Sequence, residues 1–413
     1  MPERELSTSN PVETRSTAVA PFSIVCLSPS GWCVDLPTNR QQIMRRFAQR
    51  GHEILFVETA PFVGRLVSRA LRTRRWSEVR GIVSAVVVGR GVRTCKAFNL
   101  LPGGHTYRFP NAVNVFLTAR RIRRLARSLP RPFVLWIYDP CMAGTVGSCG
   151  EAFAVYDCID DYSALTFYGA RERSLVAHAD ERSARVAKVV ATTTRALYER
   201  HSARNAETYL VPNVGDFEHF NPASQPEFAA PELHDVRRPI IGFSGNLMPG
   251  KVDFALLETL AKMRPDWTLL LVGPTAGRSV EEGLRRLTQL ENVRWLGPKP
   301  YEEVPRYVAA FDVGLCPYVW NDWMRSGFPL KLYEYLAAGK PVVASGNPDL
   351  AGMEPDVVLA RGATEFAAAV EHALRLDSEQ DRGRRISLAA HNTWDTRTQR
   401  LLDLVSAQLA RPC

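Results

Sequence analysis

Short apolar runs and longer amphipathic segments alternate along the chain in a regular order. In the first half the apolar runs predict buried strands at 22–28, 53–58, 82–88, 133–138, 153–156 and 189–192. Patterns with helical spacing lie between some of these runs, at 40–50 and 170–187. Strands that alternate with helices are typical of the α/β class, in which the sheet is mostly parallel.

A second series of the same kind follows a proline-rich, charged linker that ends at Pro239. It predicts strands at 240–243, 267–272, 293–296, 313–317 and 341–345, and helices at 254–263, 280–290, 304–311 and 397–409. A chain of 413 residues exceeds what one hydrophobic core usually serves. Two doubly wound, Rossmann-like domains account for both the length and the pattern.

Cysteine usage and the N-terminal segment indicate the compartment. The eight cysteines show no Cys-x-x-Cys or zinc-like spacing, which favours a reducing environment over a disulfide framework. Residues 1–21 are polar and lack the apolar core of a signal peptide, and no later run is long enough to span a bilayer. We therefore expect a cytoplasmic protein with a disordered tail over 1–21.

The net charge of +9 is concentrated in one region. Residues 61–132 contain sixteen Lys or Arg and a single acid, Glu78. Arginines interleave with apolar residues at 65–75 and 113–127, a pattern that suits amphipathic helices on an anionic membrane leaflet. A solvated arginine-rich face explains the same pattern equally well. Nucleic-acid binding is disfavoured, because no recognition motif is present and few aromatic residues interleave with the basic ones.

The most informative stretch is 328–345, Phe-Pro-Leu-Lys-Leu-Tyr-Glu-Tyr-Leu-Ala-Ala-Gly-Lys-Pro-Val-Val-Ala-Ser. Lys331 and Glu334 share one face near the start of a predicted helix, Gly339 suits its end, and 341–345 reads as a buried strand. A helix N-terminus and a lysine favour phosphate, and a carboxylate can accept vicinal sugar hydroxyls. The alternative is an exposed helical ion pair of small energetic value.

This stretch closely resembles the donor-site sequence of GT-B glycosyltransferases, particularly the family 4-like (group 1) branch that builds bacterial surface polysaccharides. The resemblance implies two Rossmann-like, doubly wound parallel-sheet domains that face each other across a cleft, with donor contacts from Lys331, Leu332 and Glu334. The segment 210–220 resembles the end of the N-terminal domain in that family. We therefore expect an acceptor-binding domain over 22–215, a nucleotide-sugar-binding domain over 216–395, and a helix over 396–413 that packs back across both.

Further donor contacts are expected at the carboxyl ends of the C-terminal strands, where open α/β sheets bind ligands. Gly245 and Asn246 stand where the family carries Gly-Arg, so the arginine is missing, and Lys251 matches a following lysine that holds the diphosphate. Gly273 begins a strand-end turn that lines the base pocket in relatives. Tyr318 has a ring that suits stacking on the base or sugar, with packing as the alternative.

The candidate catalytic group is a cluster of carboxylates after a predicted strand of the N-terminal domain: Asp157, Asp160 and Asp161. Crowding raises the pKa values of carboxyl groups, which suits a general base. Similar inverting enzymes, such as the glucuronosyltransferase of xanthan assembly, place an Asp base at the position of Asp160, and Asp161 is the second candidate. Helix capping is the alternative role, which we expect for at least one of the three. Arg40, at the start of the first predicted helix, is either a substrate contact or a cap.

The resemblance implies a metal-independent glycosyltransferase that moves a sugar from a nucleotide diphosphate sugar to an acceptor hydroxyl, with no further cofactor. The expected acceptor is a lipid-linked glycan at the inner membrane, in polysaccharide synthesis. Ser326 stands where retaining relatives carry the first acid of a Glu-x7-Glu motif, so inversion is favoured. A catalytically silent scaffold and a sugar-nucleotide epimerase are the alternatives, and the missing arginine and acid keep the first of these open.

Overall fold

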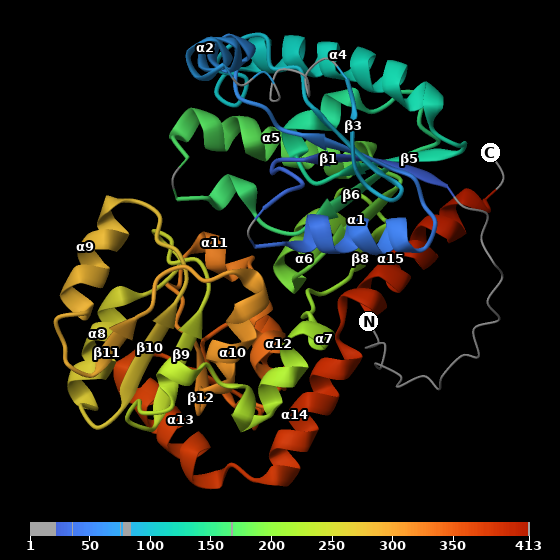
Figure 1. The fold of residues 1–413 in the computed structure, drawn as a ribbon. Coiled ribbons are helices and arrows are strands. Elements are labelled where there is room, and N and C mark those ends of the chain that lie inside the picture. The colour runs from blue at the N-terminus through green and yellow to red at the C-terminus, as the bar shows by residue number, and fades with distance from the viewer. Residues whose placement is uncertain (1–21, 35, 75, 77–83, 167, 412–413) are drawn as a thin grey trace.

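The computed structural model describes residues 22–34, 36–74, 76, 84–166 and 168–411. The expected tail over 1–21, residues 82 and 83 of one expected strand, and Glu78 lie outside the described residues. Two α/β units are visible in Figure 1, one built from the first half of the chain and one from the second.

The first unit contains an eight-stranded sheet in the order β3-β4-β2-β1-β5-β6-β7-β8, in which only the β3–β4 pair is antiparallel. The central strands are buried over most of their length, which agrees with the continuous apolar runs of the sequence, whereas all four residues of the edge strand β3 are exposed. The strands are β1 (Ser23–Ser28), β2 (Ile54–Glu58), β3 (Val86–Gly89), β4 (Val92–Lys96), β5 (Phe133–Ile137), β6 (Ala154–Cys158), β7 (Val189–Thr192) and β8 (Thr208–Leu210).

Helices cover both faces of this sheet. One apolar cluster joins the strands to α1 and α15, and another joins them to α4, α5 and α6. The helices of this half are α1 (Asn39–Gln49), α2 (Val63–Thr73), α4 (Arg108–Leu125), α5 (Ala170–Val186), α6 (Arg195–Ser202) and α7 (Phe217–Phe220). The arrangement confirms the predicted doubly wound architecture of the first half.

The second unit contains a six-stranded, fully parallel sheet in the order β11-β10-β9-β12-β13-β14. Helix α13 packs beside α8, and α14 packs beside α12. The strands are β9 (Ile240–Ser244), β10 (Thr268–Val272), β11 (Val293–Trp295), β12 (Val313–Cys316), β13 (Val342–Ser345) and β14 (Val357–Ala360). The helices are α8 (Phe254–Met263), α9 (Arg278–Leu287), α10 (Val304–Ala309), α11 (Asp322–Arg325), α12 (Leu330–Ala337), α13 (Gly362–Leu376), α14 (Glu379–His391) and α15 (Trp394–Leu409).

The chain crosses between the units twice, at 211–216 and between α14 and α15. Helix α15, red in Figure 1, leaves the second unit and packs against α1 of the first. Asp395 at its start pairs with Arg46 of α1 at 2.9 Å. At the first crossing the N–H of Gly215 donates to the carbonyl of Asn392 at 3.1 Å, so the two crossings lie side by side.

Several elements differ from the sequence-based expectation. Strand β4 was not predicted, because its Val-Arg-Thr-Cys-Lys sequence carries polar residues at positions that are only partly buried. Strands β8 and β14 and helices α13 and α14 were not predicted either, and α15 begins three residues before the expected start at 397. Within the described residues, the structure contains no helix with both the length and the apolar character needed to cross a membrane.

Candidate active site

A pocket lies between the two units, at the carboxyl ends of their parallel strands, where ligands of open α/β sheets bind. The N-terminal unit contributes the loop between β1 and α1 and the residues after β6. The C-terminal unit contributes the loops after β9 and β12 and the start of α12. The polar residues of its lining are Thr38, Asn39, Arg40, Asp160, Asn213, Asn246, Lys251, Tyr301, Tyr318, Trp323, Lys331 and Glu334.

The first turn of α12 brings Lys331 and Glu334 into this pocket. Helix α12 starts directly after Pro329, which cannot continue a preceding helical hydrogen-bond pattern. The Lys331 Nζ lies 2.8 Å from Glu334 Oε2, and the two side chains are 18% and 9% exposed. The pair is therefore mostly buried in the pocket wall, unlike the exposed helical ion pair considered as the alternative. A ligand that breaks this ion pair could bind the ammonium group of Lys331 and the carboxylate of Glu334.

The backbone at the end of β9 lies directly under Lys331. A Cβ placed on Gly245 would be 3.2 Å from Lys331 Cε, and Gly245 has φ +148°. A Cβ on Gly273, at the end of the neighbouring β10, would be 2.0 Å from the carbonyl oxygen of Gly245. Glycine is required at both positions because the two strand-end loops approach so closely. Gly273 supports the loop from behind and is not part of the pocket lining.

Lys251 and Tyr318 line the same pocket as Lys331 and Glu334. The Lys251 Nζ lies 5.6 Å from the centre of the Tyr318 ring, a cation–π distance. Burial lowers the pKa of Lys251, while Asp160 acts in the opposite direction. Asn246 lines the pocket and is exposed. The only cation that follows Gly245 in this loop is thus Lys251, since the family's arginine is absent from the sequence.

Leu332 does not reach the pocket with its side chain. It is fully buried in the core of the C-terminal unit, among the strands that α12 covers. The sequence-based assignment of Leu332 as a donor contact is therefore not supported for its side chain, because helical geometry turns it away from the face that carries Lys331 and Glu334.

Asp160 is the carboxylate of the cluster that lines the pocket. Its Oδ1 accepts a hydrogen bond from the indole N–H of Trp323 at 2.9 Å. Burial raises the pKa of Asp160 to about 6, against the lowering effects of the Trp323 hydrogen bond and of the cations Lys251 and Arg40. A carboxyl group with this pKa is mostly ionised at neutral pH and still basic enough to accept a proton.

Asp161 and Asp157 have structural roles instead. Asp161 Oδ2 pairs with Arg200 at 2.6 Å, and its Oδ1 caps the following turn by accepting from the N–H of Ser163 at 3.1 Å. Burial favours a higher pKa for Asp161, but the Arg200 and Ser163 contacts outweigh it and lower the pKa. Asp157 is fully buried and pairs with Arg397 of α15 at 2.7 Å. The capping role expected for one carboxylate is the role of Asp161, which is absent from the pocket lining.

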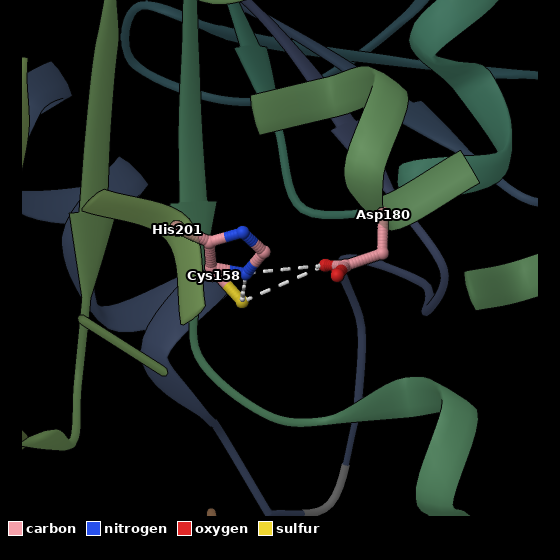
Figure 2. Close-up of side chains that lie close together, drawn as sticks. All are labelled: Cys158, Asp180 and His201. Carbon is pink, nitrogen blue, oxygen red and sulfur yellow. Dashed lines mark hydrogen bonds and ion pairs between the residues drawn. The ribbon is translucent and has the colours of Figure 1, made fainter. Parts of the chain in front are cut away.

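A buried polar cluster lies behind the end of β6, formed by Cys158, Asp180 and His201 (Figure 2). The Sγ–Nε2 distance is 3.4 Å, and Asp180 Oδ1 lies 3.4 Å from Nε2 and 3.9 Å from Sγ. These distances would suit a metal ion, but the Tyr156 hydroxyl already donates to the same Asp180 oxygen. In addition, His201 Nδ1 is buried and has no partner among the described residues, whereas a metal-bound imidazole usually donates its second N–H. We interpret the cluster as a hydrogen-bonded support for the strand end that carries Asp160.

The sequence left Arg40 with two possible roles, and it gave the pocket residues Tyr301 and Trp323 none. Arg40 donates to the Tyr162 hydroxyl and lies 5.9 Å from the ring centres of Tyr138 and Tyr162. It has no carboxylate within 4.0 Å among the described residues, and its buried Nε has no partner there either. The structure thus favours the contact role of Arg40 over the cap role. A signal for Trp323 was present in the sequence, because a tryptophan in the polar segment Trp320–Arg325 is unusual for a loop.

Comparison with protein families and curated relatives identifies one domain. Residues 238–375, from just before β9 to α13, match the family described as glycosyl transferases group 1. A Bacillus subtilis glycosyltransferase named for teichuronic acid biosynthesis, TuaH, is 28% identical over 271 residues, which span 62% of this chain and 67% of the relative. A D-inositol 3-phosphate glycosyltransferase of Nocardia farcinica is 27% identical over 260 residues, 58% of this chain and 55% of that protein.

Solved structures match over nearly the whole chain. The sucrose-phosphate synthase of Thermosynechococcus elongatus matches with a TM-score of 0.69 at 16% identity, over 94% of this chain and 99% of that one. Anabaena HepE in complex with UDP and glucose matches with a TM-score of 0.66 at 15% identity, over 93% and 99%. At this level of identity the likeness concerns the fold, which is that of two-domain GT-B enzymes.

Proposed function

The chain is a GT-B glycosyltransferase with a group 1 C-terminal domain, and from this premise we propose that it transfers a sugar from a nucleotide diphosphate sugar to an acceptor hydroxyl with inversion. The observation that carries the proposal is the position of the Lys331–Glu334 pair above the Gly245 backbone, in the same pocket as Asp160. Donor-type groups and a candidate base thus face one another from different units.

The donor half of the proposal assigns a role to each group of the C-terminal wall. Lys331 and Lys251 neutralise the diphosphate, and the open backbone at Gly245 lets it approach. When the diphosphate binds Lys331, the ion pair between Lys331 and Glu334 is broken. Glu334 then accepts hydrogen bonds from the ribose hydroxyls. Tyr318 packs beside the bound nucleotide, where its ring lies under Lys251. The same two lysines stabilise the negative charge that develops on the leaving diphosphate.

The catalytic half assigns the general base to Asp160. The acceptor oxygen forms a bond to the anomeric carbon while the bond from that carbon to the diphosphate oxygen breaks, and the electron pair leaves with the nucleoside diphosphate. Asp160 takes the proton of the acceptor hydroxyl. A single displacement of this kind inverts the anomeric carbon. Inversion is supported by Ser326, which stands where retaining relatives carry an acid. Ser326 is buried, and its carbonyl accepts a hydrogen bond from the Thr194 hydroxyl.

The proposed acceptor is a lipid-linked glycan presented at an anionic membrane surface. Support comes from α2 and α4, which lie on the side of the N-terminal unit away from the C-terminal one (Figure 1). Leu71, Phe109 and Phe116 are 64%, 75% and 58% exposed there, beside exposed arginines such as Arg72 and Arg120. Exposed apolar side chains flanked by cations suit insertion among anionic headgroups, and each cation adds about 1 kcal/mol near the surface.

The donor site is tested by thermal shift with UDP, GDP, ADP and dTDP and their sugar conjugates. A ligand at 100 times its Kd stabilises the folded state by about 2.7 kcal/mol, which raises Tm by several degrees. We expect one nucleotide to stabilise the wild type and Glu334→Gln to weaken its binding about 10-fold. The matched control is Glu258→Gln, which removes an acid paired with Lys262 on α8, away from the pocket. Equal shifts in both variants would contradict the proposed ribose contact.

Product analysis separates the proposal from the two other functions. Transfer requires an added acceptor, whereas an epimerase converts the nucleotide sugar alone. A scaffold shows neither turnover nor donor binding well above a plausible Kd. The scaffold deserves this test because Asn246 and Ser326 replace two charged residues of related enzymes.

Membrane docking is tested by co-sedimentation with phosphatidylglycerol vesicles and with neutral phosphatidylcholine vesicles. We expect binding to the anionic vesicles that weakens with salt, and at least a 10-fold loss in the double variant Phe109→Ser, Phe116→Ser. Met263→Ser is the control, because Met263 is also exposed but lies on the C-terminal unit. Unchanged binding in the double variant would exclude α4 as the docking element.

A further inference from the structure

Trp323 contacts the candidate base from the opposite unit. It lies on the short helix α11, is 6% exposed, and donates its indole N–H to Asp160 Oδ1 at 2.9 Å. Asp160 follows β6 of the N-terminal unit, and Trp323 follows β12 of the C-terminal unit. The hydrogen bond therefore joins the two walls of the pocket at the group proposed to accept the proton.

The position of Trp323 is held firmly on its own side. Asn321 caps α11 by accepting from the N–H of Met324 at 2.9 Å, and its amide donates to the carbonyl of Gly250 at 2.6 Å. The N–H of Val319 donates to the carbonyl of Lys251 at 2.8 Å. These contacts link α11 to the loop that carries Lys251. The segment that carries the indole is thus hydrogen-bonded to the loop that carries Lys251.

The indole binds only Oδ1 of Asp160, so Oδ2 remains available to a substrate. Among the described residues, Trp323 is the only side chain that donates a hydrogen bond to the Asp160 carboxylate, and Oδ2 has no hydrogen-bond partner there. The charged and titratable groups that face Asp160 are Arg40 on α1, Lys251 in the C-terminal unit, and its neighbours Asp161 and Tyr162. Arg40 and Asp161 are engaged with Tyr162 and Arg200 respectively.

Other contacts between the units surround this bond. Thr194 Oγ1 donates to the carbonyl of Ser326 at 3.3 Å, and the N–H of Arg195 donates to Asp349 Oδ1 at 2.8 Å. The first holds the residue after α11 against the start of α6, and the second holds the turn after β13 there. The Trp323–Asp160 bond thus belongs to a set of contacts that exist only when the units are apposed.

We propose that Trp323 is a positioning residue that completes the general base when the two units come together, by fixing the Asp160 carboxylate with Oδ2 directed at the acceptor hydroxyl. This inference rests on the proposed role of Asp160. When the units separate, Asp160 loses its only direct donor among the described residues, and its carboxylate is free to rotate. Sugar transfer is thereby restricted to the state in which Lys251 and Asp160 face the same ligand, which limits hydrolysis of the donor by water.

The test is the pH dependence of kcat/KM in Trp323→Phe, which keeps an aromatic ring but loses the N–H. A hydrogen bond to a carboxylate favours its ionised form, so the acidic limb of the profile should move upward by about one pH unit. We also expect kcat to fall about 10-fold with donor KM within about 2-fold, because the ring still packs and the donor wall is intact. Trp320→Phe is the matched control, since Trp320 lies three residues earlier, is 46% exposed and does not line the pocket.

Two further variants keep the result interpretable. Trp323→Gln retains an N–H donor and should keep the acidic limb closer to the wild-type position than Trp323→Phe does, even if kcat falls. Should Trp323→Phe fail to fold, the comparison of Trp323→Gln with Trp323→Leu provides the same readout. A profile and kcat equal to wild type in Trp323→Phe, with Asp160→Asn inactive, would overturn the role of Trp323 and leave the base in place. Activity in Asp160→Asn would overturn the base itself.

Discussion

At the scale of single residues, the carboxylates after β6 differ in role because each contacts different neighbouring side chains. Asp157, Asp160 and Asp161 lie within five positions of one another and are identical as side chains. Two of them pair with arginines, Asp157 with Arg397 and Asp161 with Arg200, and neither lines the pocket. Asp160 has no such pair within 4.0 Å among the described residues and faces the pocket. Asp160 is the candidate for proton transfer because no cation in the described part of the chain is paired with it.

We predict that Asp160→Asn abolishes transfer, by at least 100-fold in kcat, while donor binding by thermal shift is retained. In the wild type, kcat/KM should rise with pH through about 6, because the base works only when ionised and burial raises its pKa to that value. Asp161→Asn is the comparison: it weakens the Arg200 pair and should lower the free energy of unfolding by about 1–3 kcal/mol while transfer is retained. The acidic limb of its pH profile should move slightly downward, because the Asp161 charge raises the pKa of Asp160. A profile without an acidic limb near pH 6 would contradict the role of Asp160.

At the scale of elements, the proposed donor wall depends on the close approach of two strand-end loops and one helix start. The loops after β9 and β10 touch at Gly245 and Gly273, and the start of α12 places Lys331 above them. The helix supplies charge and free N–H groups, and the glycines supply space for a phosphate to reach the backbone. The proposed diphosphate site draws on both contributions.

We predict that Gly273→Ala lowers both donor affinity and stability. The new Cβ would lie 2.0 Å from the Gly245 carbonyl at φ +142°, so the β9 loop must shift. The expected cost is about 1–3 kcal/mol in unfolding free energy and at least 10-fold in nucleotide Kd, measured by denaturant unfolding and calorimetry. Gly297→Ala is the matched control, since Gly297 also has a positive φ of +73° but a Cβ added there would meet nothing within 4 Å. Equal losses in both variants would assign the effect to backbone strain alone.

At the scale of the whole molecule, α15 ties the two units together. It follows α14 of the C-terminal unit and inserts Arg397 beneath the N-terminal sheet, where the guanidinium contacts Asp157 and the carbonyl of Pro212. Both charged side chains are fully buried. Arg397 therefore joins the last helix, the strand that precedes Asp160, and the chain crossing in one set of contacts.

We predict that Arg397→Met lowers the unfolding free energy by about 3–5 kcal/mol, because it leaves the Asp157 charge buried without its partner. The double variant Arg397→Met, Asp157→Leu should recover a large part of that loss, since it removes both charges. Arg400→Met, on the exposed side of the same helix, should change stability by less than about 0.5 kcal/mol. Denaturant unfolding measures all three, and a double variant no more stable than the single one would contradict the ion-pair explanation.

Local patterns in the sequence determined the α/β class, the two series of strands and helices, and the donor motif at 328–345. These features depend on residues a few positions apart, so periodicity and spacing express them directly. For the same reason the sequence predicted Lys331 and Glu334 on one helix face, which the structure confirms by their 2.8 Å contact. Half-buried strands such as β4 were not predicted, because polar, partly exposed residues interrupt their apolar run.

Only the tertiary structure decided which carboxylate faces the cleft, that Arg40 lines it, and that Trp323 meets Asp160. Trp323 and Asp160 are 163 positions apart, and Arg397 and Asp157 are 240 apart. Such pairs form because two sheets and a crossing helix bring distant segments together, and burial then sets their protonation and partners. The sequence by itself thus determined the proposed donor-binding pair on α12, whereas the position of the candidate base was decided by contacts between units that no local pattern records.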